Sequence, residues 1–112
     1  MSKITTHILD TSKGKPASGI TVILYRGEND EWTELSRGIT DADGRISDLA
    51  GKETGLPHGI YKIRFETKDY FDKNAITTFY PFIEIVFDIA SDEHYHIPLL
   101  LSPFGYSTYR GS

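Results

Sequence analysis

The sequence predicts an all-β protein, a β-sandwich built from short strands. Tyr61, Ile63 and Phe65 share one parity and the residues between them are charged, which is the pattern of a half-buried strand. Segments rich in glycine and aspartate interrupt such runs at residues 10–19, 27–30, 41–44 and 51–59. Short alternating strands with turn signals at close intervals are typical of two packed sheets.

Two other runs have the same period of two. One apolar face comprises Ile20, Val22 and Leu24, and another comprises Ile83, Ile85, Phe87 and Ile89, with Glu84 and Asp88 on the opposite side. The segment from Thr67 to Asn74 lacks this alternation and predicts a short helix. No internal repeat or low-complexity segment divides the chain, so residues 1–112 are predicted to form a single domain.

Composition excludes several classes of protein and site. A chain of 112 residues buries roughly two thirds of its unfolded surface, enough for its own core. The absence of cysteine excludes a disulfide framework and a thiolate zinc site. A net charge of −4 argues against a nucleic-acid partner, which usually meets a basic patch. No stretch approaches the ~20 apolar residues of a membrane span, and residues 1–7 lack the apolar run of a secretory leader, so a cytoplasmic location is expected.

The last residues leave two interpretations open. Residues 99–109 are apolar and aromatic almost throughout, and they lead into Tyr109, Arg110, Gly111 and Ser112. From residue types alone, an edge strand with a frayed end is the favoured interpretation, because chain ends are usually mobile. The alternative is a functional set, since an aromatic ring, a guanidinium and a free carboxylate can together close a pocket around an anionic or heterocyclic ligand.

His7 and Arg45 are the first side chains to weigh as candidates for chemistry. His7 shares a strand face with Thr5 and Leu9, and a neutral imidazole can accept a proton from water near pH 7. Arg45 follows the turn Asp43-Gly44, and the nearby carboxylates lack the later glutamate of a calcium loop. On residue type alone, a strand histidine and an arginine after a turn are more often surface residues.

The remaining histidines carry weaker signals. His94 and His96 lie on one strand face and have the spacing of two zinc ligands, but no nearby residue completes a ligand set. His94 is interpreted as a turn or surface residue, and His58, in a predicted turn, is assigned no chemistry. The sequence also lacks a nucleotide-binding glycine loop and a serine nucleophile elbow.

The whole chain resembles the 5-hydroxyisourate hydrolases of the transthyretin family. The terminal Tyr-Arg-Gly-Ser resembles the signature that separates these hydrolases from transthyretin, a hormone carrier of the same fold. Further resemblance lies in Ile8-Leu9-Asp10, Gly14-Lys15-Pro16-Ala17, Gly59-Ile60-Tyr61-Lys62, Leu99-Leu100-Leu101-Ser102-Pro103-Phe104 and Tyr106-Ser107-Thr108. The resemblance implies a transthyretin-like sandwich of about eight strands with one short helix. It also implies a homotetramer, a dimer of dimers with a central channel.

The resemblance also implies an activity and its residues. The expected reaction opens the six-membered ring of 5-hydroxyisourate, the product of urate oxidation, to give 2-oxo-4-hydroxy-4-carboxy-5-ureidoimidazoline. His7, Arg45 and His96 match the family's catalytic residues: the histidines would position and deprotonate water, and the arginine would bind the polar edge of the ring. Tyr109 and Arg110 would form the pocket floor and clamp, and the Ser112 carboxylate would orient the cationic groups. No cofactor or metal is expected.

Two other functions compete with this one. A transthyretin-like carrier would bind a small hydrophobic ligand in the channel without chemistry, but the bulky Tyr109 and Arg110 should plug that channel. A structural adhesion domain of the sandwich type would have no use for the histidines, Arg45 or the terminal signature.

Overall fold

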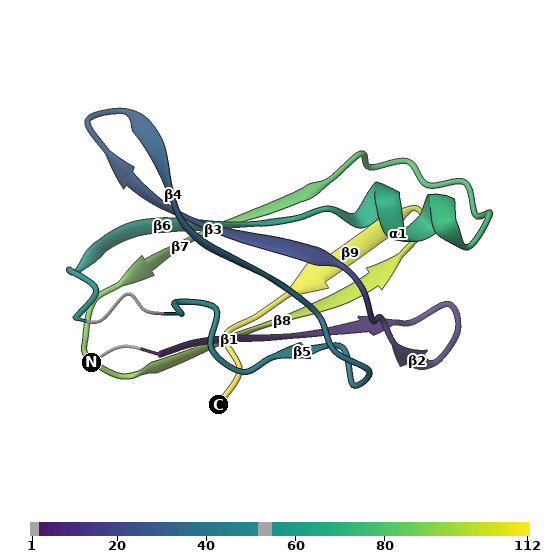
Figure 1. The fold of residues 1–112 in the computed structure, drawn as a ribbon, viewed down its shortest axis with the longest axis horizontal. Helices are drawn as coiled ribbons and strands as arrows, with labels where there is room; N and C mark the ends of the chain where they lie inside the picture. The colour runs from purple at the N-terminus through teal and green to yellow at the C-terminus, as the bar shows by residue number, and fades with distance from the viewer. Residues whose placement is uncertain (1–2, 52–54) are drawn as a thin grey trace.

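The protein is a two-layer sandwich, described by a computed structural model over residues 3–51 and 55–112 (Figure 1). The five-stranded sheet contains β2 (Lys15–Pro16), β1 (Lys3–Asp10), β8 (His94–Ser102) and β9 (Gly105–Thr108) in that order, and β5 (Arg45–Ile46) pairs with β1 beside β2. The four-stranded sheet has the order β4 (Glu31–Ile39), β3 (Thr21–Glu28), β6 (Gly59–Phe65) and β7 (Ile83–Ile89). Helix α1 (Thr67–Lys73) lies between β6 and β7 in the chain. The predicted all-β sandwich with one short helix is confirmed; part of the predicted turn at 51–59, residues 52–54, lies outside the described residues.

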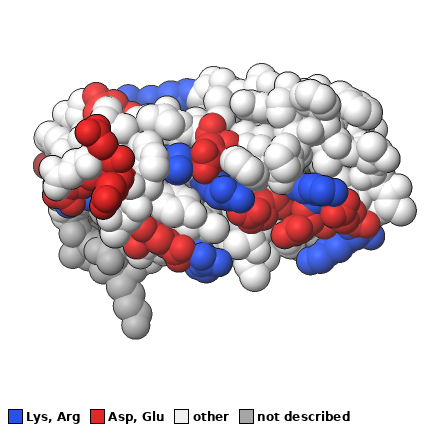
Figure 2. Space-filling model, turned by 90° about the horizontal axis from the view of Figure 1, so that it is seen from above, with Lys and Arg blue, Asp and Glu red and all other residues white. Residues whose placement is uncertain are grey.

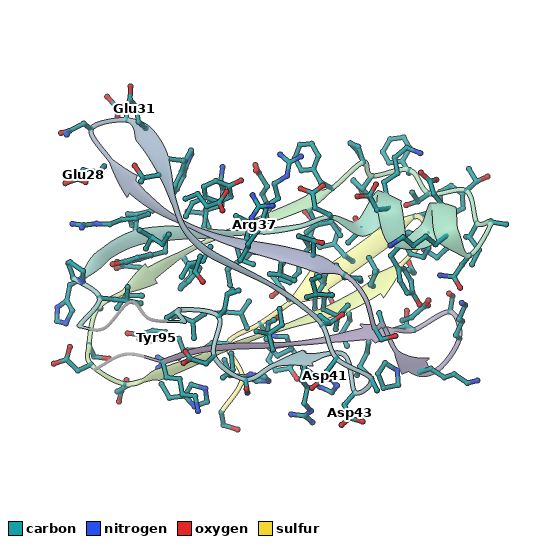
Figure 3. All side chains as sticks on the ribbon, in the orientation of Figure 1. Glu28, Glu31, Arg37, Asp41, Asp43 and Tyr95 are labelled. Atoms are coloured by element: carbon teal, nitrogen blue, oxygen red, sulfur yellow. The ribbon has the colours of Figure 1, made fainter. Side chains whose placement is uncertain are left out.

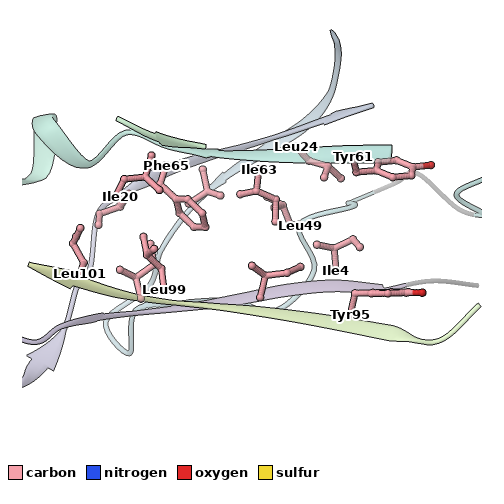
Figure 4. Packing of buried hydrophobic residues seen from close by; sticks show 14 of the residues in the cluster. Ile4, Ile20, Leu24, Leu49, Tyr61, Ile63, Phe65, Tyr95, Leu99 and Leu101 are labelled. Carbon is pink, nitrogen blue, oxygen red and sulfur yellow. The ribbon is translucent and has the colours of Figure 1, made fainter. Parts of the chain in front are cut away.

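The core lies between the two sheets, where the predicted alternating positions meet (Figure 4). Tyr61, Ile63 and Phe65 on β6 are fully buried, as predicted from their parity. The face formed by Ile20, Val22 and Leu24 is buried as well. On β7 the outer members Ile83 and Ile89 are buried, whereas the two between them are only half-buried because β7 is a sheet edge.

Strands β1 and β8 run parallel, and this pairing joins the two ends of the chain. Thr5 is opposite His96 and His7 is opposite Pro98. Along β1, the buried positions alternate with half-buried ones, so Thr5 and His7 face away from the core. The predicted parity of the first strand is therefore confirmed. It places His7 on the outer face of the sheet, the face on which His96 of β8 also lies.

The outer face of the four-stranded sheet carries charges of both signs close together (Figure 2). Lys62 Nζ lies 3.1 Å from a Glu84 carboxylate oxygen and over the rings of Tyr25 and Trp32, at 4.8 and 4.6 Å from their centroids. These rings leave Lys62 only 9% exposed. Charged positions between the buried residues of a half-buried strand usually face solvent, but here β3 and β4 fold their aromatic side chains over the lysine.

The only helix in the described part of the chain, α1, spans seven residues. Over residues 3–51 and 55–112, no helix is long and apolar enough to cross a bilayer.

Asp10, at the end of β1, is a fully buried carboxylate held by donors. Its oxygens accept hydrogen bonds from the Tyr70 hydroxyl at 2.8 Å, and from the Ser12 hydroxyl and amide at 2.5 and 3.0 Å. Burial raises the pKa of Asp10, but the hydrogen bonds from Ser12, Tyr70 and the Lys13 amide outweigh it and hold the pKa below the ordinary 3.8. This cluster ties the loop after β1 to helix α1.

The Asp10 cluster predicts an acid-sensitive contribution to stability. A carboxylate with a lowered pKa stabilises the folded state fully above about pH 3.8, and this contribution is lost as the pH falls through the lowered folded value. We expect Asp10→Asn to lower the free energy of unfolding by about 1–3 kcal/mol at neutral pH, because buried donors lose a charged acceptor. Urea unfolding at neutral and acidic pH measures this. The difference between the two proteins should shrink in acid, and a pH-independent difference would contradict the assignment.

Candidate functional site

A pocket of about 240 Å³ opens on the outer face of the five-stranded sheet, where β1, β5 and β8 meet. All of its lining residues except Ile46 carry a polar or charged group. The lining residues are Lys3, Thr5, Thr6, Arg45, Ile46, Ser47, His94, His96 and Ser112. Three of the predicted site residues, Arg45, His96 and Ser112, therefore come together from the middle and the end of the chain.

A tight turn presents Arg45 to this pocket. One Asp41 carboxylate oxygen accepts hydrogen bonds from the amides of Asp43 and Arg45 at 2.9 and 3.0 Å, and both aspartates lie in the loop beside β5 (Figure 3). Gly44 has a φ of +73°, and a Cβ there would lie 2.5 Å from the Ile8 carbonyl oxygen, so only glycine fits. The predicted turn is confirmed, and it fixes Arg45 opposite His7 in the pairing of β5 with β1.

His96 combines partial burial with a defined hydrogen bond. Its Nδ1 lies 2.7 Å from the Thr5 hydroxyl oxygen, and its carbonyl accepts the Gly111 amide at 2.8 Å. Burial lowers the pKa of His96 below the ordinary 6.5, and the nearby charges of His94, His7 and Arg45 lower it further. The imidazole is therefore neutral near pH 7 and can accept a proton.

His94 is exposed, as the sequence interpretation placed it, and it also lines the same pocket. It is exposed at the start of β8, and its Nε2 lies 2.7 Å from the same Thr5 oxygen that contacts His96. The sequence feature that could have indicated a role for His94 in this site was the pair of histidines on one strand face. What the sequence could not supply was the threonine, because it comes from a strand 89 residues away.

The other two histidines occupy different surroundings. His7 is half-buried on the outer face of β1, between its pairing partners Arg45 and Pro98, and it is one of the neighbours that lower the pKa of His96. It does not itself line the pocket, which opens farther along β1. His58 is an exposed residue with its Nε2 3.3 Å from an Asp92 oxygen.

The terminal residues divide between two pockets in the single chain. Gly111 bridges to His96, and Ser112 lines the first pocket. Tyr109 and Arg110 instead line a second pocket of about 330 Å³, which has apolar walls from β7 and β8. The Arg110 guanidinium lies 4.4 Å from the centroid of the Tyr95 ring, and its Nη2 donates to Glu93 at 3.2 Å. The contact of Tyr109 and Arg110 with substrate stays a prediction, and one chain alone does not bring them to the imidazoles.

Residues 3–51 and 55–112 contain no group of three or more His, Cys, Asp or Glu side chains arranged to hold a metal ion. The two histidines of β8 have ring centroids 6.3 Å apart and share a threonine between them. We expect dialysis against a strong chelator to leave turnover unchanged, measured on the same preparation before and after. Activity lost on chelation and restored by zinc would contradict a metal-free site and favour His94 and His96 as ligands.

Comparison with known proteins assigns the chain to a family. The model of the HIUase/Transthyretin family matches residues 4–111. The chain belongs to the HIUase/Transthyretin family.

Both the 5-hydroxyisourate hydrolases and the transthyretins among the similar proteins share the fold. The 5-hydroxyisourate hydrolase of Salmonella typhimurium is 47% identical over 110 residues, which is 97% of this chain and 80% of that protein. The structure of Klebsiella pneumoniae 5-hydroxyisourate hydrolase superposes with a TM-score of 0.87 at 41% identity and covers 100% of both chains. Sea bream transthyretin in complex with thyroxine has a TM-score of 0.90 at 37% identity, with coverage of 97% and 94%. Within the HIUase/Transthyretin family the fold alone does not separate an enzyme from a carrier, so the residues of the site must do so.

Proposed function

We propose that the protein is a 5-hydroxyisourate hydrolase that opens the ring of its substrate to give 2-oxo-4-hydroxy-4-carboxy-5-ureidoimidazoline. The observation that carries this proposal is the half-buried, neutral His96 in one pocket with Arg45, with His7 close beside them. A neutral imidazole can deprotonate water, and a guanidinium can stabilise the charge that develops on the carbonyl oxygen of a cyclic amide.

The chemistry follows from what each group can do. A water molecule held between His7 and His96 loses a proton to an imidazole as its oxygen attacks the ring carbonyl. The negative charge that develops on the carbonyl oxygen is stabilised by Arg45, whose planar fork of donors also suits the carbonyl and nitrogen acceptors of the ring. The protonated imidazole then returns its proton to the ring nitrogen as the carbon–nitrogen bond breaks. Arg45 is able to hold its position because the Asp41 turn fixes its backbone.

The proposal includes a homotetramer, a dimer of dimers, in which Tyr109 and Arg110 complete the site of a neighbouring protomer. Two features support it: β7 and β9 are sheet edges that pair on one side only within the described chain, and Tyr109 is 59% exposed. Exposed edges and aromatic side chains need covering.

Sedimentation equilibrium tests the assembly. We expect a mass about four times the 12.6 kDa of the chain. Dilution to a species of one-chain mass should abolish turnover, because the terminal residues could then no longer reach a neighbour's imidazoles. A fully active monomer would contradict the shared site but not the hydrolase assignment.

The test of the function is the disappearance of freshly generated substrate. Urate and urate oxidase supply 5-hydroxyisourate in the cuvette, and addition of this protein should accelerate the loss of its ultraviolet absorbance. Urate itself, without the oxidase, should remain unchanged. A decay equal to the spontaneous rate would reject the proposal.

Similarity to a thyroxine complex of transthyretin makes a carrier the second candidate. Arg45 and the imidazoles of His94 and His96 in the first pocket favour the enzyme, since a hydrophobic ligand gains little from such groups. Saturable thyroxine binding without any turnover would favour the carrier. The cysteine-free composition is compatible with a reducing compartment, and we propose the cytoplasm, which cell fractionation can check.

A further inference from the structure

Three side chains on the outer face of β1 and β8 form one hydrogen-bonded chain. The Thr5 hydroxyl oxygen lies 2.7 Å from Nε2 of His94 and 2.7 Å from Nδ1 of His96. A hydroxyl has one hydrogen, so it donates to one imidazole and accepts from the other when both rings are neutral. The position of the proton on one ring therefore decides the tautomer of the other.

The two ends of this chain have different access to water. His96 is half-buried and lines the pocket with Arg45, whereas His94 is exposed. When His96 donates its Nδ1 proton to Thr5, its Nε2 is left without a proton and can act as a base. In that arrangement Thr5 donates to His94, so a continuous path for a proton leads from the half-buried His96 to the exposed His94.

We propose that His94, Thr5 and His96 act as a proton relay for the hydrolysis, with Thr5 and His94 as positioning residues that work through His96. This inference rests on the proposed function.

The relay carries one positive charge from the attacking water to His94. The O–H bond of the attacking water breaks. Its proton forms a covalent bond with Nε2 of His96, while the hydroxide oxygen forms a bond with the ring carbonyl carbon. The Nδ1 proton of His96 passes to the Thr5 oxygen, and the former Thr5 proton passes to Nε2 of His94. His96 is again neutral, with its proton on Nε2, and the positive charge rests on the exposed His94 imidazole.

The reverse shift completes the cycle. His96 gives its Nε2 proton to the ring nitrogen as the carbon–nitrogen bond breaks, and its Nδ1 recovers a proton from Thr5. Thr5 in turn recovers a proton from His94, which becomes neutral. The relay thus moves the positive charge off the half-buried His96, where burial and the neighbouring Arg45 disfavour a protonated imidazole.

Four variants test the relay. Thr5→Val preserves the shape of the side chain and removes its hydroxyl, and Thr5→Ser restores the hydroxyl. His94→Gln keeps a hydrogen-bonding group but cannot take up a proton, and His58→Gln is the matched control at an exposed histidine outside the site. His7, Arg45, Lys3 and Ser112, the other charged or titratable groups near His96, stay the same in all four.

We expect Thr5→Val and His94→Gln to lower kcat by ~10-fold to 10²-fold with little change in KM. This loss is smaller than the full contribution of a positioned base, because His96 itself is retained. Thr5→Ser should recover most of the loss, and His58→Gln should match the wild type. NMR of isotope-labelled imidazole nitrogens supplies a readout without substrate. His96 should occupy one tautomer in the wild type and a mixture in Thr5→Val.

Failure of the proposed relay can be distinguished from failure of the proposed function. Wild-type kcat in folded Thr5→Val or His94→Gln would overturn the relay, as would an unaltered His96 tautomer or a failure of Thr5→Ser to rescue. No turnover by the wild-type protein would overturn the proposed function, and the relay's catalytic role with it, even if the NMR shows the coupled rings.

Discussion

Replacing either imidazole, as His7→Ala or His96→Ala, is expected to lower kcat by ~10² or more, the usual scale for a positioned acid or base. The free energy of unfolding should change little, because both side chains face away from the core on the outer side of the five-stranded sheet. Steady-state kinetics on generated substrate, with thermal unfolding of the same preparations, measures both effects.

The matched control for these variants is His58→Ala. His58 is exposed beside Asp92 and lies outside the pocket, so its removal should leave kcat at the wild-type value. Near wild-type turnover in His7→Ala would remove His7 from the mechanism, and the same result in His96→Ala would reject the whole account of the site.

Gly111→Ala is expected to damage activity far more than its single methyl group suggests. A Cβ at this position would lie 2.5 Å from Cδ2 of His96 and 3.3 Å from Cγ of Pro98. Either the imidazole shifts or the tail detaches from β8, and a misplacement of about 1 Å can cost ~10² in rate. Kinetics should show a fall in kcat of that order, while the melting temperature should change little because the contact lies outside the core.

Gly105→Ala is a suitable control for the added methyl group. Its Cβ would meet only the Ser102 Oγ, at 3.7 Å, which is an ordinary contact. We expect wild-type kcat for Gly105→Ala. If Gly111→Ala is equally active, the tail does not constrain His96, and the close approach at Gly111 has no catalytic role.

Local periodicity was sufficient to predict the sandwich and the face on which His7 lies. A strand repeats every two residues, so the parity of Thr5 and His7 follows from the buried positions around them. The turn before Arg45 was also predictable, because Asp43-Gly44 is a strong local signal and Gly44 adopts the left-handed conformation that it implies.

Features that depend on distant pairing were not predictable in the same way. The hydrogen bond between Thr5 and His94 requires the parallel register of β1 and β8, which no local pattern specifies. The burial of Lys62 depends on Trp32 from another strand. The direction of the tail is set by the bridge from Gly111 to His96, and this bridge leaves Arg110 against Tyr95 rather than in the first pocket.

The most direct measurement is the rate of 5-hydroxyisourate decay with wild-type protein and with a variant that lacks all three proposed catalytic side chains, His7, Arg45 and His96. Both proteins are compared at equal concentration after confirming equal folding. The account predicts rapid, concentration-dependent decay with the wild type and the spontaneous rate with the triple variant. Equal rates for the two proteins, whether both fast or both spontaneous, would contradict it.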